Sequence, residues 1–149
     1  MFFLVKYDQY NVSVTTIDSL TAAFGPRISD DGFTGYIAVA NPLGACTKID
    51  APPRVPYVDD KKWIALIMRT PTIYGNCSFD VKVLNAQKAG FAAVIIYNSE
   101  SDNLIKMSST GFYNIKIPSV FVGHSSGIEI TKYYTYINKT FVILNNDDG

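Results

Sequence analysis

The fold of this chain is decided by WIALIM at Trp63–Met68 and by AAVIIY at residues 92–97. Every residue in these two runs is apolar or aromatic, which is typical of strands that are buried on both faces of a sheet. Strands of this kind usually lie parallel and are covered by a helix. The stretch between the two runs should therefore contain the helix that connects them.

The connecting stretch has the signals of a helix with defined ends. Ser78 is a typical N-cap residue, and Gly90 can adopt the left-handed conformation with which helices commonly end. Between them, Phe79, Val83 and Ala86 would lie on one helix face. The two runs and this helix are thus predicted to form a strand–helix–strand unit.

The remaining elements are predicted from shorter signals on either side of this unit. They are strands at residues 5–14, 35–40, 118–122 and 140–144, a short capped helical turn at residues 18–26, a loop at residues 43–60, and a second helix from Ser125 or Ser126 to about Tyr136. The predicted fold class is α/β, with a mixed sheet flanked by two main helices.

A chain of 149 residues is long enough to bury a core of its own, and the sequence contains no internal repeat. No change of composition marks a domain boundary. Residues 1–149 are therefore predicted to form one domain, with a fraying polar tail at residues 145–149.

The balance of charged and apolar residues argues against two classes of function. Thirteen Lys and Arg residues offset 13 Asp and Glu residues, whereas a nucleic-acid surface needs an excess of basic side chains. The longest apolar run, residues 91–97, is far shorter than the ~20 residues of a membrane span, and no signal peptide is visible. We expect no nucleic-acid partner and no direct membrane insertion by this chain.

Two cysteines and three glycosylation sequons bear on the compartment. Cys46 and Cys77 can close one disulfide, or they can remain as two buried free thiols. The sequons begin at Asn11, Asn76 and Asn138. An oxidising and glycosylating compartment accounts for both features, so a lumenal or extracellular position is expected.

One pattern imitates a catalytic motif. Residues 123–127 (GHSSG) match the nucleophile elbow G-x-S-x-G between a predicted strand and a predicted helix. Ser125 would need a histidine base from a separate part of the chain, and the only histidine, His124, lies inside the elbow itself. We interpret the motif as a strand-to-helix turn with a serine N-cap and keep a hydrolase that uses Ser125 as a third hypothesis.

Cofactor sites are not expected in this chain. Zinc needs three or four close Cys, His or carboxylate ligands, which one histidine and two distant cysteines do not supply. The acidic pairs at residues 59–60 and 147–148 lack the loop pattern of a calcium site, and no phosphate-binding loop is present. We therefore expect no catalytic residue and no metal ligand.

Several longer motifs resemble the protease-associated (PA) domain family. They are WIALIMR at residues 63–69, NCSFDVKVLNAQKAG at 76–90, AVIIYN at 93–98, DNLIKM at 102–107 and IPSVFVG at 117–123, with FG at 24–25, GYI at 35–37 and NPLGAC at 41–46 before them. The chain is most similar to the branch in which this domain is joined to a transmembrane helix and a cytosolic RING finger. The resemblance implies a β-sandwich or barrel flanked by helices, and the binding of protein or peptide ligands.

The resemblance also implies site residues. Cys46 matches the first and Cys77 the second of the family's paired cysteines. In the sorting receptors of the family, an arginine just before the second cysteine lies in the cargo-binding loop, and Arg69 is the matching residue, with a longer link to Cys77 here. Ile73 and Tyr74 add an aliphatic and an aromatic side chain, so Arg69, Ile73 and Tyr74 are the predicted ligand-binding residues.

The leading hypothesis from these observations is a substrate- or cargo-recruiting ectodomain of a single-span RING-type E3 ubiquitin ligase on endosomal or lysosomal membranes. Zinc would then be bound only by a RING outside this chain. The alternative is a PA domain of a sorting receptor or of a membrane peptidase.

Overall fold

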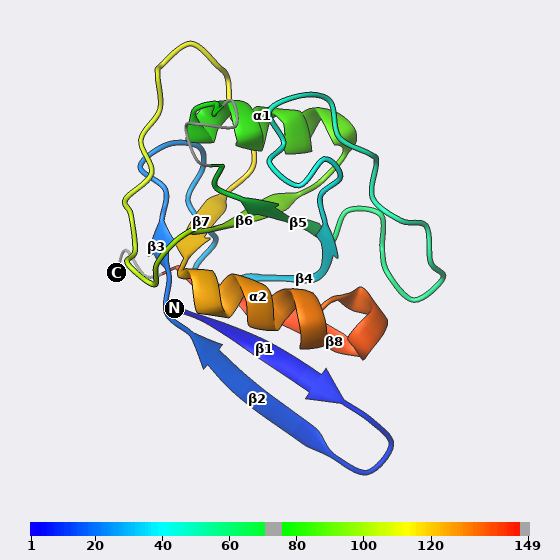
Figure 1. Ribbon diagram of the computed structural model, residues 1–149. Helices are drawn as coiled ribbons and strands as arrows, with labels where there is room; N and C mark the ends of the chain where they lie inside the picture. Colours follow the sequence, from blue (N-terminus) through cyan, green and yellow to red (C-terminus); the bar gives the residue numbers. More distant parts are fainter. Residues whose placement is uncertain (71–75, 147–149) are drawn as a thin grey trace.

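The computed structural model describes residues 1–70 and 76–146, which form an eight-stranded mixed sheet with helices on both faces (Figure 1). The strand order is β2-β1-β8-β4-β5-β6-β7-β3. The elements are β1 (Phe2–Tyr7), β2 (Val12–Ile17), β3 (Leu20–Thr21), β4 (Phe33–Val39), β5 (Trp63–Met68), α1 (Phe79–Ala89), β6 (Ala93–Tyr97), β7 (Ser119–Val122), α2 (His124–Tyr133), the 3-10 turn η2 (Tyr136–Asn138) and β8 (Thr140–Leu144). The predicted α/β fold class is confirmed.

The centre of the sheet is parallel. β4, β5, β6 and β7 run in one direction, and the outer pairs β3–β7, β4–β8, β1–β8 and β1–β2 are antiparallel. β5 is connected to its neighbour β6 through α1, which begins after Ser78 and ends at Gly90 in a left-handed conformation. The predicted strand–helix–strand unit is therefore confirmed.

The face of β5 that points toward α1 forms one hydrophobic core. Trp63, Ala65 and Ile67 of β5 share this core with Val83 and Ala86 of α1, and all five are almost completely buried. Figure 1 shows α1 lying across this side of the central strands.

The opposite face of β5 belongs to a second core. Ile64 and Leu66 pack there with Ile130 of α2, on the other side of the sheet from α1. Leu4 of β1 and Val142 of β8 join the same core, so the antiparallel strands curve over this face beside α2. The first five residues of β5 are buried, which explains why its sequence has no polar residue.

Two predicted elements near the amino terminus are wrong. Residues 5–14 do not form one strand, because the chain turns after Tyr7 and the Asp8 carboxylate accepts the backbone N–H groups of Tyr10 and Asn11. Residues 18–26 contain the short strand β3 instead of a helical turn. Their backbone donors are used by distant segments, as in the 3.0 Å bond from Ala22 N to the Ser119 carbonyl.

The second helix is shorter than predicted and has a different cap. α2 ends at Tyr133, and the chain continues into η2 instead of extending the helix to Tyr136. Its N-cap residue is Gly123, whose missing side chain cannot cap the helix. The expected serine N-cap is therefore wrong.

Close contact between α2 and β6 gives a stability prediction. A β carbon on Gly127 would overlap the ring of Tyr97, which is buried in β6. Gly127→Ala should lower the free energy of unfolding by about 1–3 kcal/mol, because overpacking outweighs the better helix propensity of alanine. Denaturant unfolding measures the effect against Glu129→Ala, an exposed position of the same helix. Equal stability of the two variants would show that α2 packs less closely than described.

Candidate functional site

The predicted ligand-binding arginine lies where the central parallel strands end. Arg69 directly follows β5, and Asn98 directly follows β6. The Arg69 guanidinium donates to Asn98 Oδ1 at 3.3 Å, and its backbone N–H donates to the Tyr97 carbonyl at 2.9 Å. Ligands of α/β sheets commonly bind at the carboxyl ends of the strands, which makes this edge the candidate site.

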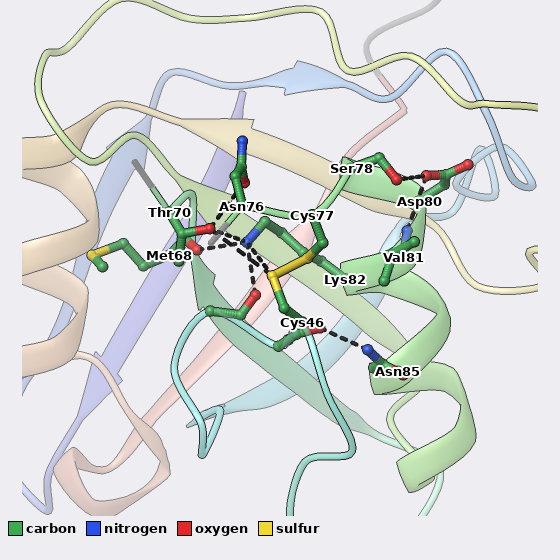
Figure 2. Close-up of a disulfide and its surroundings, with 12 residues drawn as sticks. Cys46, Met68, Thr70, Asn76, Cys77, Ser78, Asp80, Val81, Lys82 and Asn85 are labelled. Carbon is green, nitrogen blue, oxygen red and sulfur yellow. Dashed lines mark hydrogen bonds between the residues drawn. A yellow bond between two sulfur atoms is a disulfide. The ribbon is translucent and has the colours of Figure 1, made fainter. Parts of the chain in front are cut away.

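A disulfide joins two loops at this edge, as predicted. Cys46 and Cys77 are bonded with their Cα atoms 5.5 Å apart (Figure 2). The bond connects the loop after β4 to the residue before the N-cap of α1. The 31-residue separation corresponds to about 3.5–4 kcal/mol of stabilisation in the chain-entropy estimate.

The buried side chain of Lys82 holds the same loops together from inside. Its ammonium donates to the Gly44 carbonyl at 2.7 Å, to Thr70 Oγ1 at 3.2 Å and to the Met68 carbonyl at 3.3 Å, and it lies 3.8 Å from Cys46 Sγ (Figure 2). One lysine of α1 thus connects the loop after β4 to the end of β5.

This arrangement leaves the site electropositive. Burial, with a smaller contribution from the nearby positive charge of Arg69, lowers the pKa of the Lys82 amine to about 8. The oxygen and sulfur atoms around the ammonium carry no net charge. Two cations, one buried and one partly exposed, therefore lie at the candidate site without a carboxylate among the partners described for either side chain.

A second buried charge fixes a neighbouring loop to α1. Asp80 Oδ2 accepts from Ser109 Oγ at 3.3 Å and from the backbone N–H and hydroxyl of Thr110 at 2.8 and 2.7 Å. Burial by itself raises the pKa of the Asp80 carboxyl, but hydrogen bonds from Ser78, Thr110 and Val81 lower it below its ordinary value. The carboxylate is therefore held in its charged form and anchors the loop between β6 and β7.

Sequence reasoning did not find Asp80 or Lys82. Both residues are charged, and both lie in the helix whose apolar face was predicted from Phe79, Val83 and Ala86. Each is nevertheless fully buried. Their signal in the sequence was position: Asp80 and Lys82 follow the disulfide cysteine Cys77 by three and five residues, at the helix end that meets the loops.

The three predicted glycosylation sites do not lie together: one is at the candidate site and two are elsewhere. Asn76 lies at this edge, where its Oδ1 accepts from the Thr70 hydroxyl at 2.9 Å. Ile73 and Tyr74 lie outside the described residues. Asn11 lies in the β1–β2 turn and Asn138 in η2, so these two sequons belong to another part of the molecule.

The nucleophile-elbow motif has no catalytic pairing in the described residues. Ser125 Oγ donates to Asp102 Oδ2 at 2.9 Å, and Ser125 N donates to Asp102 Oδ1 at 2.8 Å. Asp102 therefore provides the cap of α2 from another loop, and these hydrogen bonds lower the pKa of its carboxyl. The imidazole of His124 instead lies with Nδ1 2.9 Å from the Asn98 carbonyl.

The described part of the chain contains neither a cluster of metal ligands nor a membrane-spanning helix. Within residues 1–70 and 76–146, no three His, Cys, Asp or Glu side chains are grouped as metal ligands. In the same ranges, no helix has the length and apolar character needed to cross a membrane.

Comparison with protein families and curated proteins gives consistent matches. The PA domain model matches residues 29–130. The chain is 36% identical over 135 residues to the Drosophila melanogaster E3 ubiquitin-protein ligase Godzilla, and 39% identical over 144 residues to the human E3 ubiquitin-protein ligase RNF13. These alignments cover 90% and 95% of this chain but only 24% and 36% of the two relatives.

A rice protein and two solved structures extend the comparison. The chain is 34% identical over 122 residues to the rice receptor homology region, transmembrane domain- and RING domain-containing protein 1, covering 79% of this chain and 21% of that protein. The zinc aminopeptidase BSAP from Bacillus subtilis matches 97% of this chain with a TM-score of 0.60, 21% identity and 30% of its own length. A Shewanella amazonensis M28 peptidase precursor matches 97% of this chain and 34% of its own length, with a TM-score of 0.63 and 12% identity. These two structures share the fold.

The pKa of Lys82 predicts a pH effect on stability. Because the folded pKa of about 8 lies below the ordinary lysine pKa of 10.5, the unfolded chain binds this proton more tightly. The free energy of unfolding contributed by Lys82 should therefore rise as the pH increases from about 8 to about 10.5. Urea unfolding should show this rise in wild type and in the exposed-site control Lys88→Met, but not in Lys82→Met. Identical pH profiles of all three proteins would contradict it.

The hydrogen bonds of Ser125 predict that it does not react as a nucleophile. Purified protein should neither cleave nitrophenyl esters nor become labelled by a fluorophosphonate, because the hydroxyl donates to Asp102 and not to an imidazole. Mass spectrometry of the treated protein checks the labelling, with Ser126→Ala as the neighbouring control. Labelling that disappears only in Ser125→Ala would establish a reactive serine.

Proposed function

We propose, from the premise that this chain belongs to the PA domain family, that it is the recognition ectodomain of a membrane-anchored RING-type E3 ubiquitin ligase. In this role the domain binds a protein or peptide ligand and performs no catalysis itself. Similarity over nearly the whole chain to proteins named as E3 ubiquitin-protein ligases carries the proposal.

Ubiquitin transfer would belong to other parts of such a protein. The chain spans about a quarter to a third of the length of the curated ligases it matches. A RING and its zinc ions would lie outside the 149 residues, as would the single membrane span. The proposed role of this chain is to select what the ligase acts on.

The disulfide supports a lumenal or extracellular position for the domain. Disulfides persist in oxidising compartments and are rare in the cytosol. The Cys46–Cys77 bond connects two loops at the candidate site, so its reduction would loosen the surface proposed to bind the ligand. Endosomal or lysosomal membranes are the proposed location.

The candidate site has the properties of a prepared binding surface. The disulfide and Lys82 fix the loop after β4, and Asp80 fixes the loop between β6 and β7, so a ligand that contacts these two loops would cost them little conformational entropy. Arg69 is partly exposed, and one of its donors bonds with Asn98. The planar guanidinium fork can bind a carboxylate or backbone carbonyl of a ligand.

Substitution of the arginine tests this proposal. Arg69→Ala and Tyr74→Ala should each weaken binding by about 1–2 kcal/mol, which is roughly a fivefold to thirtyfold higher Kd. Arg69→Ala should keep the wild-type melting temperature, since the arginine lies at the partly exposed end of a strand.

The probe is a peptide selected from a random library on the immobilised wild-type domain. It is titrated calorimetrically into wild type, both variants and Arg54→Ala, which removes an exposed arginine from the proline-containing loop. Equal affinity for all four proteins would place the interface elsewhere.

A further inference from the structure

One edge of the sheet is an open template for strand pairing. β2 is an end strand, and the described structure pairs it with β1 alone. Its sequence, VSVTTI, contains neither charge nor proline, and Val12 and Val14 are 68% and 60% exposed. Edge strands normally carry a charge, a proline or a cover that stops another chain from adding to the sheet.

The other edge needs no such protection. It is formed by β3, which has only two residues, Leu20 and Thr21. A very short edge offers few backbone groups to a second chain. Among the described residues, the six-residue β2 thus has no charge, no proline and no neighbouring strand on its outer side. Figure 1 shows the β1–β2 hairpin extending from the body of the protein, where a second chain can reach it.

Two sequons lie together beside this edge, although 127 residues separate them in the sequence. Asn11 is exposed in the turn that leads into β2. Asn138 lies in η2, and the next residue, Lys139, accepts the Tyr7 backbone N–H at 3.0 Å. Asn11 and Asn138 line the same surface pocket of about 450 Å³, together with Val12 at the start of β2.

We propose that N-linked glycans on Asn11 and Asn138 cover the open β2 edge and prevent it from pairing with a second copy of this chain. The inference rests on the proposed lumenal or extracellular position, where glycosylation takes place. Asn11 would carry one glycan immediately before β2, and Asn138, across β1 and just before the start of β8, would carry the other at the same end of the sheet. VSVTTI can pair antiparallel with itself, because it brings no like charges together.

The local chemistry is compatible with modification. Each asparagine Nδ2 forms a bond to the anomeric carbon of a lipid-linked oligosaccharide diphosphate, loses one proton, and releases the lipid diphosphate. Asn138 Oδ1 accepts from the backbone N–H and hydroxyl of Thr135, both at 3.1 Å. The carbonyl oxygen remains in the product, so this cap survives glycosylation.

The third sequon is not part of this cover. Asn76 lies beside the disulfide and accepts a hydrogen bond from Thr70 at the candidate ligand site. A glycan at Asn76 would lie over that site and not beside the β2 edge.

The experiment compares protein that carries its full glycans, secreted from human cells, with the same protein after an endoglycosidase has trimmed the glycans. Peptide mass spectrometry should find glycans on Asn11 and Asn138, and light scattering should show a monomer. Two treatments should each lower the dimerisation Kd at least tenfold: endoglycosidase trimming of the wild-type protein, and the Asn11→Gln substitution in untrimmed protein. Trimming leaves every side chain in place, so an effect of the Gln substitution on folding cannot imitate this result.

A charge placed on the edge identifies the surface involved. Val14→Lys in the trimmed protein should restore the monomer, whereas Val39→Lys, at an exposed valine of β4, should not. Unmodified asparagines, a trimmed protein that stays monomeric, or rescue by both lysines would each overturn the proposal. Peptide affinity is measured before and after trimming in the Asn76→Gln background, where no glycan lies over the Arg69 site. This keeps the outcome separate from the ligand-binding proposal.

Discussion

Burial of β5 on both of its faces is the constraint from which the architecture follows. Alternate side chains of one strand enter two different cores, and each core needs its own cover. The helix α1 covers one side, and α2 with the curved strands β1 and β8 covers the other (Figure 1). The parallel strands therefore end together at one edge, where their loops converge.

Those loops are held by charged groups that the hydrophobic cores would ordinarily exclude. A buried ammonium is costly unless its donors are satisfied, and Lys82 satisfies them with oxygen atoms of the loops it joins. Asp80 does the same for the loop before β7. The disulfide adds a covalent link at the same edge. Anchored loops, and two cations with no carboxylate among their described partners, are thus two results of one arrangement.

The two proposed surfaces lie at different parts of the sheet. Recognition is proposed at the carboxyl ends of β5 and β6, where the loops are fixed, and protection is proposed at the β2 edge, where strand pairing is open. A glycan beside β2 would not interfere with a ligand near Arg69. On this proposal, glycans at Asn11 and Asn138 keep the PA domain monomeric and leave the binding edge accessible.

The sequence by itself determined the central elements and the family, but not the elements near the amino terminus. Apolar runs and end signals located β5, α1, β6 and β8, and the family's paired cysteines identified the disulfide. Only the tertiary structure decided that Asp80 and Lys82 are buried, that Asp102 caps α2, and that two distant sequons meet beside β2. The physical reason is range: strand and helix patterns depend on neighbouring residues, whereas burial of a charge and the meeting of two loops depend on chain segments that approach only after folding.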